Sequence, residues 1–196
     1  MTNGTPLDSR HTNLALELRK AGIEPLLYGY SDTSVDPRSF HAQDPSLDTF
    51  ESILPGFKSV IDFNLGYLGG WLDWLEDQGY ERPNPSESVF HHSPEKITAG
   101  RFCDEPAFYA AEHSDTAYLT HHACHTIRNY RNEDWFIHLS VLRPHPPLIA
   151  PAPYNRLYNW RDLPPPERGS SHKSDAAMHP LLELWQEKID TCLLYT

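Results

Sequence analysis

The chain has 196 residues, with 27 acidic and 16 basic side chains and a formal net charge of −11. This negative charge opposes binding to nucleic-acid phosphates and to anionic membrane surfaces, so neither partner is expected. The cysteines, Cys103, Cys124 and Cys192, are odd in number and widely spaced, which is typical of a reducing compartment and predicts a cytoplasmic protein. The N-terminal residues are polar, and no apolar run approaches the ~18 residues of a membrane span.

The first stretch of the chain predicts a helix followed by a strand. Asp8 or Ser9 can cap a helix that runs through Lys20, and Gly22 just beyond it is a stop signal. The apolar run at 25–30 then predicts a short strand that leads into a polar loop.

A second strand and a second helix are expected before the middle of the chain. Residues 60–63 have strand character, and residues 68–75 predict a short helix that ends near Gly79. Trp71 and Trp74 lie three apart on one helical face, which favours a role in packing over a ligand platform.

A longer helix is predicted from the caps at 113–115 to Tyr130. Its apolar stripe recurs at helical spacing. The stripe consists of Leu119, Ala123, Ile127 and Tyr130. The other side carries His121, His122 and His125, which either face solvent or form an independent metal site, although no H-E-x-x-H motif supports the metal.

The central prediction concerns the run WFIHLSVL at 135–142, which contains no turn former. Such a run is typical of a parallel strand that is buried on both faces, and Pro144 is expected to end it. His145 then lies beyond the carboxyl end of a strand, where ligands bind in open α/β sheets. The alternative is an ordinary histidine in a stiff proline-rich loop.

Polar residues also follow the first predicted strand. Because the carboxyl ends of parallel strands meet at the same edge, Tyr30, Asp32, Thr33 and His145 are expected to converge on one crevice. Ordinary turn chemistry is the alternative explanation for the polar loop at 31–34. Half of the 18 prolines follow Arg143, in the last quarter of the chain, which predicts an extended segment over about 143–170.

Several motifs in order carry a resemblance to a known family. They are NGTPLD at 3–8, GYSDTSVDPR at 29–38, WFIHLS at 135–140, RPHPP at 143–147 and PYN at 153–155. Together they resemble the sulfatase and phosphonate monoester hydrolase branch of the alkaline phosphatase superfamily. The resemblance implies an α/β sandwich with a central mixed, largely parallel sheet, incomplete in this chain.

The resemblance also implies hydrolysis of sulfate, phosphate or phosphonate esters at a divalent metal, calcium or manganese, in the complete family member. Family members attack with a formylglycine made from the cysteine of a C-x-P-x-R or C-x-A-x-R motif, and this chain has no such motif. The later Asp-His or Asp-Asn pair of the metal site and the lysine after it are also missing. No metal is therefore expected on this chain alone.

By motif, His145 matches the family's active-site histidine, which contacts the anionic group or the leaving-group oxygen of the ester. Asn3 and Tyr30 match positions that line the pocket of phosphonate hydrolase relatives. Asp32 and Thr33 compete for a further position, where relatives carry a hydroxyl. If Asp32 occupies it, an additional negative charge faces an anionic substrate.

Residues 1–196 are interpreted as the middle portion of a single sulfatase-like domain, inactive alone because the nucleophile motif and the metal ligands are absent. The partner in a complete enzyme is a small anionic ester, and a homo-oligomer is left open. The alternative is a non-catalytic binding or scaffold protein derived from the same fold.

Overall fold

The computed structural model describes residues 5–64, 66–90, 105–145, 148–165 and 171–188. The chain divides into two compact units, Met1–Val89 with Tyr109–Leu148, and Phe90–Phe108 with Ile149–Thr196. The first unit contains the sheet. The assignment of residues 1–196 to a single sulfatase-like domain stays a prediction.

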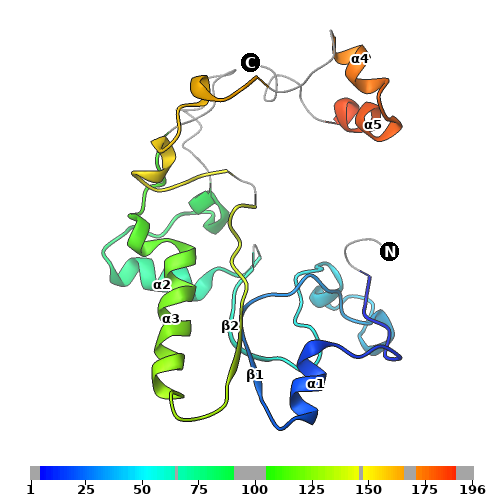
Figure 1. The fold of residues 1–196 in the computed structure, drawn as a ribbon, viewed down its shortest axis with the longest axis vertical. Coiled ribbons are helices and arrows are strands. Elements are labelled where there is room, and N and C mark those ends of the chain that lie inside the picture. Colours follow the sequence, from blue (N-terminus) through cyan, green and yellow to red (C-terminus); the bar gives the residue numbers. More distant parts are fainter. Residues whose placement is uncertain (1–4, 65, 91–104, 146–147, 166–170, 189–196) are drawn as a thin grey trace. The chain divides into compact units, whose positions relative to one another are not determined.

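The sheet has three strands in the order β2-β1-β3, and both pairings are parallel (Figure 1). The strands are β1 (Pro25–Gly29), β2 (Lys58–Asp62) and β3 (Phe136–Leu139). β1 and β3 lie within the runs predicted at 25–30 and 135–142, whereas β2 begins two residues before and ends one residue before the strand predicted at 60–63. The predicted α/β class is confirmed.

The buried central strand is β1, so the prediction that the run at 135–142 is covered on both faces is wrong. All residues of β1 are buried, whereas β3 has only four residues, which range from half-buried to exposed. Leu139 is 37% exposed and Trp135 is 42% exposed. The reason is position, because among the described residues β3 pairs only with β1 and therefore lies at an edge.

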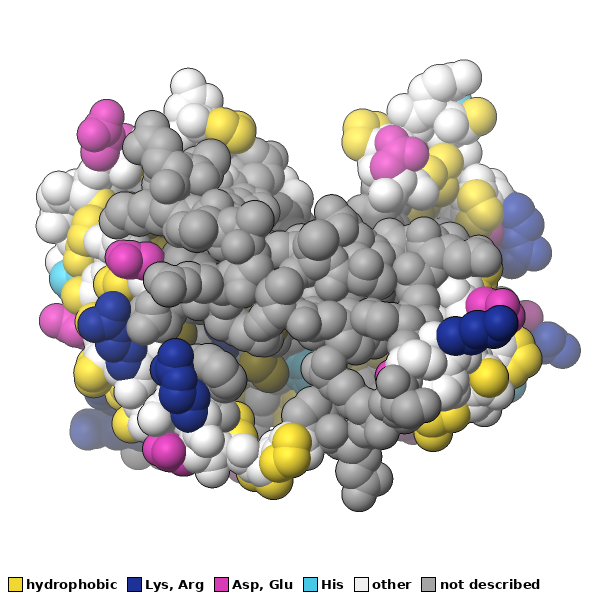
Figure 2. Space-filling view, turned by 90° about the horizontal axis from the view of Figure 1, so that it is seen from above, with side chains coloured by type: hydrophobic (Ala, Val, Ile, Leu, Met, Phe, Trp, Pro, Cys, Tyr) yellow, Lys and Arg dark blue, Asp and Glu magenta, His cyan; other side chains and the backbone are white. Residues whose placement is uncertain are grey.

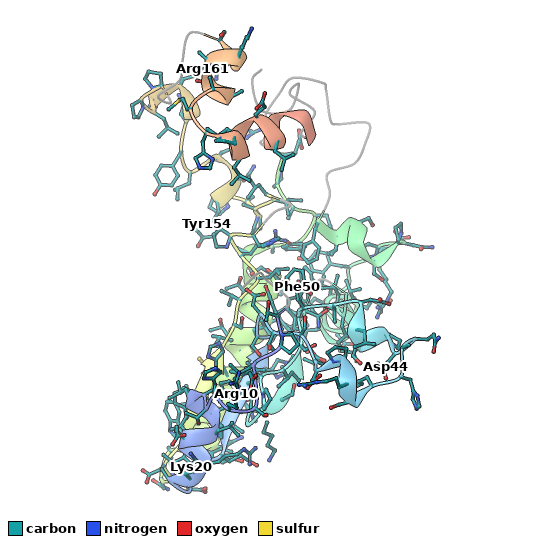
Figure 3. All side chains as sticks on the ribbon, turned by 90° about the vertical axis from the view of Figure 1, so that its right-hand side faces the viewer. Arg10, Lys20, Asp44, Phe50, Tyr154 and Arg161 are labelled. Atoms are coloured by element: carbon teal, nitrogen blue, oxygen red, sulfur yellow. The ribbon has the colours of Figure 1, made fainter. Side chains whose placement is uncertain are left out.

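Helix α1 (Leu14–Lys20) begins later than predicted. Its N-cap is Asn13, whose side chain accepts a hydrogen bond from a first-turn amide, and not Asp8 or Ser9. Asp8 is engaged elsewhere, since it accepts hydrogen bonds from the backbone and the guanidinium of Arg10, which is labelled in Figure 3.

Helix α2 (Gly69–Asp77) packs through Trp71, as predicted. Trp71 is completely buried, and its indole N–H donates to the carbonyl of His113 at 3.0 Å. Its ring meets Phe63 and Tyr109 edge-on, with centroids 6.0 and 5.2 Å apart. Trp71 therefore anchors the core of the first unit.

Helix α3 (Asp115–Asn129) is capped by Ser114, and its predicted apolar stripe is only half correct. Leu119 and Ala123 are buried, but Ile127 and Tyr130 are 36% and 38% exposed. The helix has 15 residues and is roughly 22 Å long, whereas the five residues of β1 span only about 17 Å. The C-terminal turns of α3 therefore exceed the length of the sheet that they could cover.

The second unit contains α4 (His172–Ala176) and α5 (Pro180–Lys188). The extended segment predicted over about 143–170 is only partly correct, because 3₁₀ turns at Tyr154–Arg156 and Trp160–Asp162 interrupt its described part. In the same unit, the amide of Ala107 donates to the carbonyl of Ala150 at 2.9 Å.

Short 3₁₀ turns complete the described elements of the chain. They are η1 (Pro37–Ser39), η2 (Pro45–Leu47), η3 (Ser86–Phe90), η5 (Ala111–His113), η6 (Tyr154–Arg156) and η7 (Trp160–Asp162).

Within the described ranges, no helix combines the length and the apolar character that crossing a membrane requires. On the face seen in Figure 2, acidic and basic side chains of the described residues are interspersed with hydrophobic ones.

Candidate functional site

The carboxyl ends of β1 and β3 lie unusually close together. The amide of Ser140 donates to the carbonyl of Tyr28 at 2.8 Å, which continues the pairing just past β3. Gly29 has a φ of +102°, and a Cβ at this position would lie 2.2 Å from the carbonyl oxygen of Ser140. Only glycine fits this contact. The segments that follow the two strands therefore start from adjacent points on the sheet edge where α/β proteins bind ligands.

The loop after β1 is tied to residues 51–54. Thr33 is 6% exposed, and its carbonyl accepts a hydrogen bond from the amide of Ser52 at 3.1 Å. Its hydroxyl lies 3.4 Å from the carbonyl of Ser34 and donates to it. Asp32, in contrast, is exposed, and Tyr30 is half-buried. The loop thus separates a buried hydroxyl from an accessible carboxylate.

The surroundings of Tyr30 are negatively charged. Partial burial raises the pKa of the Tyr30 phenol, and the carboxylates of Asp32 and Glu51 raise it further. The phenol therefore stays protonated at neutral pH and can donate a hydrogen bond.

His145 lies in a turn beyond β3, on the carboxyl side of the strand as predicted. Its amide donates to the carbonyl of Leu142 at 3.0 Å, and its side chain is exposed. Pro144 does not end the strand, because β3 already ends at Leu139. The described contacts leave both earlier interpretations of His145 in place, the catalytic histidine and the loop histidine.

The predicted site residues fall into two groups. Tyr30, Asp32 and Thr33 lie in the loop after β1, and His145 follows β3. Their convergence on one crevice stays a prediction, and Asn3 lies outside the described residues.

A buried charged cluster beside this turn was missed in the sequence. Arg143 Nε lies 3.4 Å from Asp115 Oδ2, and the two side chains are only 19% and 2% exposed. Asp115 Oδ1 accepts a hydrogen bond from the amide of Thr116 at 2.9 Å. Tyr109, only 3% exposed, belongs to the same cluster, because, besides burial, the negative charge of Asp115 raises its pKa and the positive charge of Arg143 lowers it. Asp115 was interpreted only as a helix cap.

The protonation of this cluster reflects its burial. Burial raises the pKa of Asp115, and the positive charge of Arg143 opposes that rise. Burial raises the pKa of Tyr109 to about 12, and the negative charge of Asp115 adds to it. Asp115 is the first residue of α3, where the helix dipole favours a carboxylate.

The histidines of α3 do not form a metal site. His121 and His125 are exposed, and His122 packs against Tyr118 with ring centroids 4.8 Å apart. Burial lowers the pKa of His122, and the neighbouring histidines lower it further. In the described part of the chain, no group of three or more His, Cys, Asp or Glu side chains could hold a metal.

The described residues therefore do not fit the divalent metal that the resemblance implies.

Cys124 is a half-buried free thiol on α3, while Cys103 and Cys192 lie outside the described residues.

Comparison with known proteins relates the chain to a group of hydrolases. No protein-family model matches it. The multifunctional alkaline phosphatase superfamily protein PehA of Trinickia caryophylli is 35% identical over 187 residues, which is 95% of this chain and 36% of PehA. The phosphonate monoester hydrolase SpPMH of Silicibacter pomeroyi matches with a TM-score of 0.84 and 37% identity over 99% of this chain and 38% of its own. The phosphonate monoester hydrolase of Agrobacterium radiobacter matches with a TM-score of 0.76 and 39% identity over 93% of this chain and 35% of its own.

The homologues of this chain are thus members of the alkaline phosphatase superfamily, and the resemblance inferred from the motifs is confirmed. The two solved structures compared above are phosphonate monoester hydrolases. The chain spans 36% of the length of PehA and 38% of that of SpPMH.

Proposed function

We propose that this chain is part of a hydrolase of phosphonate, phosphate or sulfate esters, in which His145 donates a proton or a hydrogen bond to the ester. The observation that carries the proposal is the match to two phosphonate monoester hydrolases over 99% and 93% of the chain. The position of His145 beyond the carboxyl end of a parallel strand supports it.

The proposed chemistry of His145 is that of a general acid. As the bond from phosphorus or sulfur to the leaving-group oxygen breaks, the imidazole passes a proton to that oxygen or stabilises its negative charge by a hydrogen bond. An imidazole suits this role near neutral pH. Its exposed side chain is accessible to an ester that approaches from solvent.

The loop after β1 is proposed to contact the substrate. The Tyr30 phenol is protonated and can donate to an anionic oxygen. Of the two residues that compete for the neighbouring position, Asp32 is exposed, while Thr33 is buried with its hydroxyl directed to a backbone carbonyl. This contrast favours Asp32 as the residue that faces the ligand.

The nucleophile and the divalent metal, calcium or manganese, are proposed to belong to regions that the longer relatives possess and this chain does not span. The metal would supply Lewis acidity toward the ester oxygens. The chain by itself is therefore proposed to be inactive.

A chimera tests the proposal. The matching segment of SpPMH is replaced by this chain, and the chimera and the isolated chain are assayed against a phosphonate monoester, a phosphate ester and a sulfate ester. The chimera should hydrolyse at least one class, and the isolated chain none. In the chimera, His145→Ala should lower kcat by ~10²-fold or more without lowering the melting temperature. His125→Ala, an exposed imidazole on α3, is the matched control.

Equal turnover by the chimera and its His145→Ala variant would show that His145 is only a loop histidine.

One observation favours the alternative of a non-catalytic protein, namely the carboxylates of Asp32 and Glu51 near Tyr30, which repel an anionic ester. A chimera that melts cooperatively but hydrolyses none of the esters would support that alternative.

A further inference from the structure

The turn that carries His145 is closed by two contacts. The amide of His145 donates to the carbonyl of Leu142 at 3.0 Å. Across the turn, Arg143 Nη1 lies 3.5 Å from the carbonyl oxygen of His145, a contact longer than an ordinary hydrogen bond. Pro144 between them restricts the backbone. The position of the Arg143 guanidinium therefore affects the backbone conformation at His145.

The same guanidinium also lies against a rigid part of the fold. Asp115, 3.4 Å from Arg143 Nε, is 2% exposed and sits in the first turn of α3. That turn is fixed by Ser114, whose hydroxyl accepts from the amide of Ala117 at 3.2 Å. The guanidinium thus connects the His145 turn to the start of a helix.

Stability alone is a weak reason for such a pair. The desolvation of two buried charges offsets most of their attraction, and well-packed apolar side chains of similar size are often as stable. Apolar side chains could not fix the orientation of the turn. The guanidinium can, because it is planar and its N–H donors point in defined directions.

We propose that Arg143 is a positioning residue, which Asp115 holds in place so that the turn presents the His145 imidazole in a single orientation. The inference rests on the proposed function for the chemistry of His145. The orientation of the turn, however, is a property of this chain that can be measured without any turnover.

The first experiment measures the turn in the 196-residue chain by amide hydrogen exchange with NMR. Arg143→Lys keeps the charge but loses the planar fork, and Asp115→Asn keeps the shape but loses the charge. Each should speed exchange of the His145 amide by at least ~10-fold, because the turn closed by its hydrogen bond to Leu142 opens more often once the guanidinium no longer holds it. Exchange of the β1 amides, which report the core, should not change.

A matched control is available on the surface. Arg38 forms an exposed ion pair with Asp36 at 2.6 Å, across Pro37. Like the buried pair of Arg143 and Asp115, it joins an arginine to an aspartate. Arg38→Lys should leave exchange at His145 unchanged. Because Arg143 and Asp115 act through one contact, the double variant Arg143→Lys with Asp115→Asn should be no faster than the faster single variant.

The second experiment measures kcat and KM in the SpPMH chimera. Both single variants should lower kcat by ~10-fold or more with little change in KM, since the imidazole is misplaced while substrate contacts remain. If His145→Ala leaves turnover intact while the exchange effect persists, the proposed function fails and the positioning role stands.

The positioning role is overturned by either of two results. In one, His145 is essential but the Arg143 and Asp115 variants change neither exchange nor kcat. In the other, both variants lower kcat only in proportion to a loss of folded protein, with β1 amides exchanging as fast as His145, which would make the pair merely structural.

Discussion

Replacing Gly29 by alanine tests the close approach of β1 and β3 on which the candidate site depends. Gly22 provides the comparison, because it also has a positive φ, +83° against +102° at Gly29, but a Cβ there would meet nothing within 4 Å. Gly29→Ala combines the same backbone strain with a contact of 2.2 Å to the carbonyl oxygen of Ser140. The difference between the two variants isolates the contact.

The backbone strain of each alanine costs about 1–2 kcal/mol. At Gly29 the strands must also separate, which weakens the 2.8 Å hydrogen bond from Ser140 to Tyr28 and adds about 1 kcal/mol or more. Urea unfolding followed by tryptophan fluorescence should therefore show a loss of about 3 kcal/mol for Gly29→Ala and about 1–2 kcal/mol for Gly22→Ala. Equal losses would refute the close approach.

Two further predictions concern the core. Tyr109 has its pKa raised from 10.0 to about 12, so its protonated form contributes stability that is complete below pH 10 and is lost as the pH rises toward 12. Tyr109→Phe should therefore flatten the fall in unfolding free energy above pH 10 by about 1.4 kcal/mol per pH unit, and parallel curves for both proteins would contradict the assignment. Trp71→Ala should cost about 3–5 kcal/mol in urea unfolding because a fully buried indole is lost, whereas a cost below about 1 kcal/mol would mean that the ring is not a core anchor.

β1 and β3 were predictable because each combines aliphatic and aromatic residues, whereas β2 was located from Val60 and Ile61. What the pattern did not reveal is their order in the sheet. The runs at 25–30 and 135–142 have similar composition, yet β1 is central and β3 lies at an edge. Whether a strand lies in the centre of the sheet depends on its pairing with segments far away in the sequence. Local composition does not encode that pairing. The predicted start of α1 was wrong for a local reason. The Asp8 carboxylate accepts a hydrogen bond from Arg10, and Asn13 is the N-cap instead.

The site was predictable in part. The polar residues after β1 and His145 after β3 were located from strand ends alone, while their chemical roles come from the family resemblance and stay predictions. The pairing of Asp115 with Arg143 was not found, since either residue alone has an ordinary explanation, a helix start or a cation in a loop. Nothing local distinguishes a buried carboxylate from an exposed cap.

Topology does, however, restrict where such a pair can form. In a parallel sheet, a crossover helix runs antiparallel to the strand that follows it, so the start of the helix lies at the edge where that strand ends. Helix α3 precedes β3, and this geometry brings Asp115 at the start of the helix to the edge that Arg143 and His145 reach after the strand. An acidic residue in the first turn of a crossover helix and an arginine just past the next strand are therefore candidates to meet. Had this rule been applied to residues 115 and 143, the sequence would have suggested the ion pair, although not its burial.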